Sequence, residues 1–259
     1  MFNMDRIILK MRKELLENID RVYKKGSVNF FHEPVHPLGV RTPVVRRIAG
    51  EFWKKLWITE MPDHQAGIPD IRMKKERTFA LCEMLLERRT FEETLIAFQW
   101  ARMMEKDLTI KDFSRFERWL KTYVDNWAFC DDFCTHVFGS VVTRNVSLLP
   151  RVHAWRTSKN RWLRRASAVI LIHPMHSPTL STKQKRVFLK PIFETAEVLC
   201  MDQDDLVQKG YGWMLKEASK IFPAEIFNFV IEYKDTMPRT ALRYAIEKYP
   251  EEMRREAMK

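Results

Sequence analysis

The chain has 259 residues, which is enough for one large domain or two small ones with a real hydrophobic core. Hydrophobic residues make up 46% of it and aromatic residues 12%, and this composition excludes an intrinsically disordered chain. Forty-five Lys and Arg residues against 34 Asp and Glu residues give a formal net charge of +11. That excess favours a polyanionic partner such as nucleic acid or an anionic membrane surface, although a basic protein without such a partner is equally compatible with it.

The N-terminal segment gives no sign of export or membrane insertion. It alternates charged and apolar residues at helical spacing, without an uninterrupted apolar stretch or a small-residue cleavage site, so we expect no secretory signal. No apolar run in the chain is long enough to span a bilayer. Four cysteines are too few for a disulfide framework in a chain of this size. We therefore expect a cytoplasmic, nucleoid-associated protein that acts as a monomer away from the membrane.

The pattern of apolar residues predicts an all-α protein, because they recur at spacings of three and four, glycine is rare and hairpin signals are absent. A first helix is predicted over 4–25, ended by Gly26. A loop over 30–41 follows, and Thr42-Pro43 is typical of an N-cap followed by proline, which starts a helix over 44–56. After a linker over 59–69, further helices are predicted at 70–87, 91–104, 112–123, 126–143, 147–156, 160–172, 182–199, 202–221, 223–232 and 237–249.

A weak internal repeat indicates how these helices are arranged. Residues 213–223 resemble residues 240–250, with leucine, alanine and proline recurring at matching positions, and 165–174 and 77–86 are looser copies. Paired helices with a seam of small residues are typical of a HEAT-like α-solenoid, a stack of antiparallel helix pairs. We predict one such domain over 1–259, with a basic concave face that fits a nucleic acid duplex.

The stretch from Thr122 to His136 contains the first candidate functional residues. On a helix, Trp127 and Asp131 lie on one face, one turn apart, so that an aromatic ring and a carboxylate point the same way. The plainer alternative is a core tryptophan and a solvated or ion-paired aspartate, because this spacing is common on helices.

Two further segments contain residues that could meet this face. Arg165 is followed by the small residues 166–168, so it could reach a carboxylate or a phosphate bidentately, or form a salt bridge inside the solenoid. Trp213 follows Gly210 and Gly212, each of which costs roughly 1 kcal/mol in a helix relative to alanine. That cost indicates a close approach by a ligand or by another helix, and both alternatives stay open.

Metal, cofactor and nucleophile chemistry are not indicated. His32 and His36 are interrupted by Pro34, and Cys130, Cys134 and His136 lack a second pair of ligands elsewhere. Nucleophile motifs, phosphate-binding glycine loops and dinucleotide fingerprints are missing. We therefore expect no metal and no cofactor.

Four segments together resemble a known family. They are Leu38–Arg47, Asn126–Asp131, Trp162–Ala166 and Gln208–Glu217, and their order and approximate spacing agree over about residues 38–250. On these segments the chain resembles the AlkD-type DNA alkylation-repair glycosylases, a HEAT-like family that acts in base excision repair.

The resemblance implies an activity and a site. The enzyme would hydrolyse the N-glycosidic bond of cationic N3- or N7-alkylated purines in duplex DNA without base flipping, unlike most enzymes that act on bases. Trp127 and Trp213 would flank the deoxyribose, Asp131 would be the catalytic carboxylate, and Arg165 would lie near the backbone phosphate. Further DNA contacts are expected from basic and aromatic residues near these segments, namely Phe30, Arg46, Arg47, Arg161, Arg164 and Lys209.

Two departures from the family pattern bear on the activity. Phe30 stands where characterised members have a tyrosine, and Ala128 stands where a carboxylate commonly follows the first tryptophan. The alternative function is therefore a non-catalytic HEAT-like scaffold that binds DNA or a protein. An RNA-binding solenoid is less favoured, because no repeated base-reading code is visible.

Overall fold

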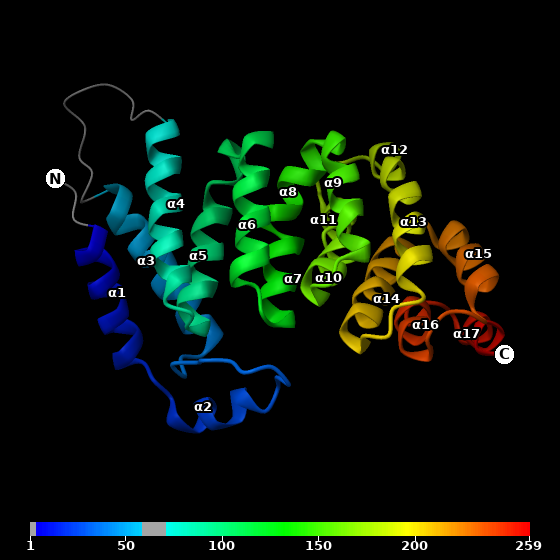
Figure 1. The fold of residues 1–259 in the computed structure, drawn as a ribbon, viewed down its shortest axis with the longest axis horizontal. Coiled ribbons are helices and arrows are strands. Elements are labelled where there is room, and N and C mark those ends of the chain that lie inside the picture. Colours follow the sequence, from blue (N-terminus) through cyan, green and yellow to red (C-terminus); the bar gives the residue numbers. More distant parts are fainter. Residues whose placement is uncertain (1–3, 59–70) are drawn as a thin grey trace. The chain divides into compact units, whose positions relative to one another are not determined.

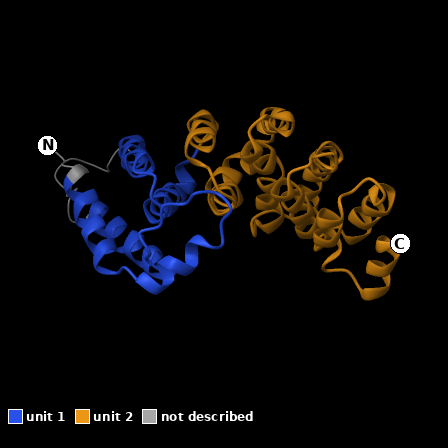
Figure 2. Ribbon diagram, turned by 60° about the horizontal axis from the view of Figure 1, so that its bottom comes forward, with its two compact units in different colours: residues 1–108 blue, residues 109–259 orange. Residues whose placement is uncertain are grey.

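The computed structural model describes residues 4–58 and 71–259, which belong to two compact units, Met1–Leu108 (unit 1) and Thr109–Lys259 (unit 2), coloured separately in Figure 2. All regular elements in these ranges are helices, which confirms the all-α prediction. The predicted linker over 59–69 lies outside the described residues. The prediction of a single domain over 1–259 stays a prediction.

The described residues of unit 1 form helices, with a longer connection over 29–41 between α2 and α3 (Figure 1). The prediction of one helix over 4–25 is wrong, because the Asp20 carboxylate accepts hydrogen bonds from the backbone N–H groups of Val22 and Tyr23 at 3.0 and 2.9 Å and starts a new helix. Gly26 lies inside that second helix. The bounds are α1 Met4–Glu17, α2 Arg21–Val28, α3 Thr42–Ile58, α4 Ile71–Glu87, α5 Phe91–Met103 and the 3-10 helix Glu105–Asp107.

The predicted loop before α3 is present and is held by one buried carboxylate. Glu92, at the start of α5, accepts hydrogen bonds from the backbone N–H groups of Leu38, Gly39 and Val40 at 2.8, 2.8 and 2.9 Å. Gly39 has a φ of +106°, which favours glycine. This segment, one of the four that carry the family resemblance, therefore has a structural role inside unit 1.

Unit 2 consists of helices that pack against their neighbours along the chain (Figure 1). The short helix α11 lies outside the predicted ranges except at its first residue, α17 lies wholly outside them, and the stretch predicted as a helix over 182–199 is divided. The α-helices are α6 Phe113–Tyr123, α7 Trp127–Thr135, α8 Val137–Arg144, α9 Leu149–His153, α10 Arg161–Val169, α11 Ile172–His176, α12 Thr182–Lys185, α13 Leu189–Leu199, α14 Asp205–Ser219, α15 Pro223–Tyr233, α16 Arg239–Ile246 and α17 Glu251–Met258. The 3-10 helices are Ile110–Asp112, Val146–Leu148, Ala154–Thr157 and Arg186–Phe188.

The helix predicted over 126–143 is interrupted at His136, whose backbone is not helical. Gly139 permits the bend, because a Cβ atom there would lie 2.4 Å from the carbonyl oxygen of Cys134 and 2.5 Å from the Cβ atom of His173. The prediction of one continuous helix here is therefore wrong, and two helices, α7 and α8, meet at an angle that only a glycine permits.

Buried aromatic rings hold the inner face of α7. Phe133 packs edge-on against Phe116 of α6 at a ring-centroid distance of 5.5 Å and lies 5.3 Å from Phe138 of α8. All three side chains are fully buried, and such clusters dominate the stability of a core. With Phe129, Cys130, Phe133 and Cys134 buried, the part of α7 that remains partly exposed includes Trp127 and Asp131.

The seam of small residues predicted from the repeat is present between α14 and α16. A Cβ atom at Gly212 would lie 2.7 Å from the carbonyl oxygen of Ala241 and 2.8 Å from the Cβ atom of Tyr244. A Cβ atom at Gly210, two residues earlier, would meet the side chain of Arg165 at 3.1 Å instead. Packing between helices therefore accounts for both glycines. The basic concave face predicted from the sequence stays a prediction.

The two glycines differ in what a methyl group would meet. Gly212→Ala is expected to lower the free energy of unfolding by about 2 kcal/mol, because the added methyl meets backbone that cannot move aside. Gly210→Ala is expected to stay within about 1 kcal/mol of the parent, since the helix propensity of alanine offsets a contact with a side chain. Urea unfolding followed by circular dichroism measures both, and an equal loss in the two variants would contradict this account of the seam.

Candidate active site

Helix α7 places the predicted tryptophan and carboxylate. The buried side chain of Asn126 caps this helix by accepting a hydrogen bond from the backbone N–H of Phe129 at 3.0 Å. Trp127 is thus the first helical residue, and Asp131 follows one turn later. Both side chains are partly exposed, and the Asp131 side chain keeps 18% of its surface open to solvent.

Asp131 is paired with Arg165, which projects from α10. The Nε and Nη2 atoms of Arg165 donate to the two carboxylate oxygens at 2.8 Å each, and Nη1 donates to the carbonyl oxygen of Leu206. Only 6% of the arginine side chain is exposed, so the guanidinium lies on the inner side of the carboxylate. A bidentate pair of this kind fixes both the position and the plane of a carboxylate.

Burial and the ion pair act on Asp131 in opposite directions. Burial raises the pKa of the Asp131 carboxyl above its ordinary value, and the charge and hydrogen bonds of Arg165 offset part of that rise. Since a guanidinium stays protonated at all ordinary pH values, the arginine side of the pair remains charged. The phosphate contact predicted for Arg165 would require this buried group to leave Asp131 and Leu206, and in the structure it is the partner of Asp131.

Three helices meet at this ion pair. α10 packs against both α7 and α14, and Arg165 passes across α14 at Gly210, where a Cβ atom would lie 3.3 Å from its Nη1 atom. Trp213 is three residues further along α14 and is partly exposed. The predicted residues Asp131 and Arg165 are thus in direct contact, and Trp127 and Trp213 come from the two helices on either side of α10.

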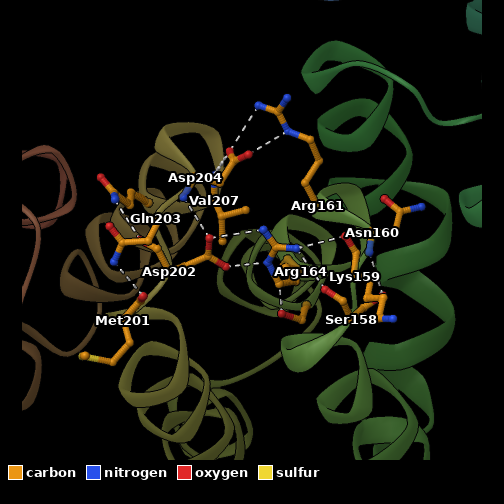
Figure 3. Close-up of polar contacts among 12 residues, drawn as sticks. Ser158, Lys159, Asn160, Arg161, Arg164, Met201, Asp202, Gln203, Asp204 and Val207 are labelled. Carbon is orange, nitrogen blue, oxygen red and sulfur yellow. Dashed lines mark hydrogen bonds and ion pairs between the residues drawn. The ribbon is translucent and has the colours of Figure 1, made fainter.

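The segment before α14 is fixed to α10 by two ion pairs (Figure 3). Arg164 donates to Asp202 at 2.6 Å and to the carbonyl oxygens of Ser158 and Lys159. Arg161 pairs with Asp204 at 2.9 Å, and Asp204 also caps α14 through the N–H groups of residues 206 and 207. The acidic segment 202–205 therefore sets how α14 lies against α10, and with it the position of Arg165.

The acidic segment partly neutralises the predicted DNA-binding residues of unit 2. Lys209 pairs with Asp205 at 2.6 Å, so each of the three predicted cations Arg161, Arg164 and Lys209 has an aspartate partner. Their exposed side-chain fractions are 39%, 20% and 37%, which makes Arg161 and Lys209 the more accessible. The sequence signal for these aspartates was the acidic run just before a helix, which is typical of an N-cap.

A second buried carboxylate was missed by the sequence analysis. Glu217, one turn after Trp213, accepts a hydrogen bond from the indole Nε1 at 3.2 Å. His176 at the end of α11 and Lys220 contact its other oxygen at 2.6 and 2.5 Å. Burial alone would raise the pKa of Glu217, but the hydrogen bonds from Lys220 and His176 outweigh it and lower the pKa. The spacing of four residues between tryptophan and glutamate was the available signal.

The remaining predicted residues belong to unit 1. The Phe30 side chain is 75% exposed in the loop after α2. Arg46 is exposed on α3 and forms no ion pair with any residue in the described ranges, whereas Arg47 pairs with Glu14 at 3.2 Å and Glu51 at 2.8 Å. An aromatic side chain and an unpaired cation at the surface are compatible with the predicted contacts to DNA.

Within residues 4–58 and 71–259, no group of three or more His, Cys, Asp or Glu side chains is arranged to hold a metal ion. The four cysteines are free and buried. None of the helices in the described part of the chain has the length and apolar character needed to cross a membrane.

Comparison with known proteins identifies the family. A solved structure described as a predicted DNA alkylation repair enzyme from Enterococcus faecalis is similar in fold, with a TM-score of 0.64 at 16% identity over 90% of this chain and 98% of that one. No curated protein sequence matches the chain significantly. The model of the DNA alkylation repair enzyme family matches residues 11–249, which include Trp127, Asp131, Arg165 and Trp213. The chain therefore belongs to the DNA alkylation repair enzyme family.

Proposed function

We propose that this protein is a DNA N-glycosylase that hydrolyses the N-glycosidic bond of cationic N3- and N7-alkylated purines in duplex DNA. Family membership gives it a role in DNA repair with DNA as its partner. The proposal adds the reaction, the lesion class, and the absence of base flipping. It also assigns Asp131, Trp127 and Trp213 as the residues that contact the lesion nucleotide.

One observation carries the proposal. The Asp131 carboxylate is held on its inner side by a bidentate arginine, yet its side chain remains 18% exposed. A carboxylate that is held on its buried side and exposed on the other can face a cation outside the protein, and the side chain need not reorganise when that cation forms. An aspartate that served only to join two helices would have no need of this opening.

The chemistry of the lesion fits a site of this kind. A purine alkylated at N3 or N7 already carries positive charge and leaves readily, so the enzyme needs no strong general acid. What develops as the bond breaks is positive charge on the sugar, as in glycoside hydrolysis. Asp131 would stabilise that charge and orient the attacking water, and since the reaction is directed at the sugar, the base need not enter a pocket.

The two tryptophans supply a second source of stabilisation. Their ring faces are electron-rich, and each would attract the developing sugar cation by roughly 0.5–2 kcal/mol. Trp127 and Trp213 are both partly exposed and lie on the two helices that flank α10. We further propose that Phe30, Arg46, Arg47, Arg161, Arg164 and Lys209 contact the duplex, that Arg165 acts by positioning Asp131, and that the protein works as a monomer.

A non-catalytic DNA-binding scaffold is the second candidate function. The ion pair between Asp131 and Arg165 favours it, because the same pair would also serve to join α7 to α10 in a protein without activity. Ala128, at a position where the family commonly has a carboxylate, points in the same direction.

Release of free methylated bases from randomly methylated duplex DNA decides between the two functions. Time-dependent release of 3-methyladenine or 7-methylguanine, measured by chromatography, is expected of a glycosylase. No release, combined with salt-sensitive binding of an undamaged duplex, would refute the glycosylase and leave the scaffold.

Neighbouring arginines on α10 are expected to contribute differently to DNA binding. Arg161→Ala should weaken duplex binding and reduce the slope of log affinity against log salt concentration by about 1, because this side chain is 39% exposed and a phosphate can take the place of Asp204 as its ion-pair partner. Arg164→Ala should reduce the slope less and should also lower stability, since this residue is less exposed and its guanidinium bonds two carbonyl groups. Fluorescence anisotropy over a salt series measures the slopes, and identical slopes in both variants would contradict the assignment.

A further inference from the structure

We infer that Glu217 is a positioning residue for Trp213: its buried carboxylate fixes the orientation of the indole and increases the electron density of the ring. The inference rests on the proposed function, in which Trp213 faces a developing sugar cation. It assigns a role to a residue on the buried side of α14 that would itself touch no part of the DNA.

Both carboxylate oxygens of Glu217 accept hydrogen bonds from side chains. One oxygen accepts the indole N–H of Trp213, and the other accepts from His176 and Lys220. Only 5% of the Glu217 side chain is exposed, whereas those of His176 and Lys220 are 51% and 47% exposed. The carboxylate is thus held from the outer side by two donors, and the indole N–H completes its contacts.

The hydrogen bond restricts the ring. An indole has a single donor, its Nε1–H, and a tryptophan that is partly exposed is not fixed by packing on all sides. Accepting this one N–H fixes the direction in which the ring edge points. The faces of Trp213 are thereby set before DNA arrives, which avoids an ordering cost during binding.

The charge of Glu217 also acts on the ring electrons. A hydrogen bond from an N–H to an ionised carboxylate polarises the donor group, and polarisation extends through a conjugated ring. The two donors on its other oxygen favour the ionised form. The result is a more negative ring face, and such a face attracts a cation more strongly.

Unit 2 contains a matched control for this arrangement. The indole Nε1 of Trp155 donates to Glu117 at 2.9 Å, and Glu117 also pairs with Arg151 and Lys121 at 2.8 and 3.3 Å. Trp155 is buried, and neither residue belongs to the proposed site. Glu117→Gln therefore removes the same kind of charge from the same kind of bond without touching Trp213.

The test compares single-turnover excision and DNA affinity in the two variants. Glu217→Gln is expected to slow base release about tenfold, the factor that corresponds to about 1.4 kcal/mol, with affinity for an undamaged duplex within about twofold of the parent. Glu117→Gln is expected to leave the rate unchanged. Trp213→Phe, which removes the donor but keeps Glu217 paired with His176 and Lys220, should abolish any further effect of Glu217→Gln. Equal rates in the Glu217→Gln and Glu117→Gln variants, or additive losses with Trp213→Phe, would overturn the inference.

A spectroscopic measurement separates failure of this inference from failure of the proposed function. With 5-fluorotryptophan incorporated, the ¹⁹F resonance of Trp213 is identified by its loss in Trp213→Phe. In Glu217→Gln that resonance is expected to shift and broaden, while in Glu117→Gln it stays in place. If the parent releases no base, the proposed function fails but the resonance still reports whether Glu217 orders the ring. An unchanged Trp213 resonance in Glu217→Gln would overturn the inference even in an active enzyme.

Discussion

Replacing Asp131 with asparagine is expected to reduce base release from methylated duplex DNA by at least about 100-fold, while affinity for an undamaged duplex stays within about twofold. Asparagine has nearly the same size and can still accept one hydrogen bond from Arg165. What it lacks is the negative charge that faces the sugar as the glycosidic bond breaks. The loss should therefore appear in the single-turnover rate rather than in binding.

Asp132 provides the control for this substitution. It is the adjacent carboxylate of α7, is partly exposed, and lies 3.5 Å from the Nδ1 atom of His136. Asp132→Asn removes the same charge from the same helix but not from the face with Trp127, and it should retain the parental rate. If Asp131→Asn also retains the parental rate, Asp131 is not the catalytic carboxylate.

The fold class was predictable because the spacing of apolar residues is a local property that persists along the whole chain. The helix boundaries that failed depend on side chains that compete with the backbone. Asp20 caps α2 and breaks the first predicted helix, and Gly139 permits a bend at His136 that no periodicity indicates. Both breaks follow from contacts that a pattern of apolar residues does not contain.

The candidate site was predictable only in part, for a similar reason. Trp127 and Asp131 are four residues apart, so helical geometry alone places them on one face. By contrast, Asp131 and its partner Arg165 are 34 residues apart in the sequence, and Glu217 and His176, which are also in contact, are 41 residues apart. The sequence analysis left open whether Arg165 binds a carboxylate or a phosphate, and it missed the contact of Glu217 with His176. Helix packing determines both contacts.

Removing Arg165 is expected to have the largest effect on stability. Arg165→Met leaves the Asp131 carboxylate and the carbonyl group of Leu206 without their buried partner, and such a loss lowers the free energy of unfolding by about 3 kcal/mol. Combining it with Asp131→Leu should restore most of that stability, because an apolar pair of similar volume carries no unpaired charge. Urea unfolding of the single and double variants measures the coupling. If the double variant is as unstable as the sum of the single variants, the ion pair is not the cause.

The same substitution should make stability depend on pH in a defined direction. The charge and hydrogen bonds of Arg165 lower the pKa of Asp131, so their loss moves that pKa further above its ordinary value of 3.8. The folded variant then binds the proton more tightly than the unfolded chain, and its stability is retained at acid pH and lost as the pH rises through the folded pKa. The stability deficit of Arg165→Met should therefore be smaller at about pH 4.5 than at about pH 7.5. If the stability deficit is the same at both pH values, Asp131 is protonated, or solvated, whether or not Arg165 is present. Such an aspartate could not provide the fixed charge that the proposed reaction requires.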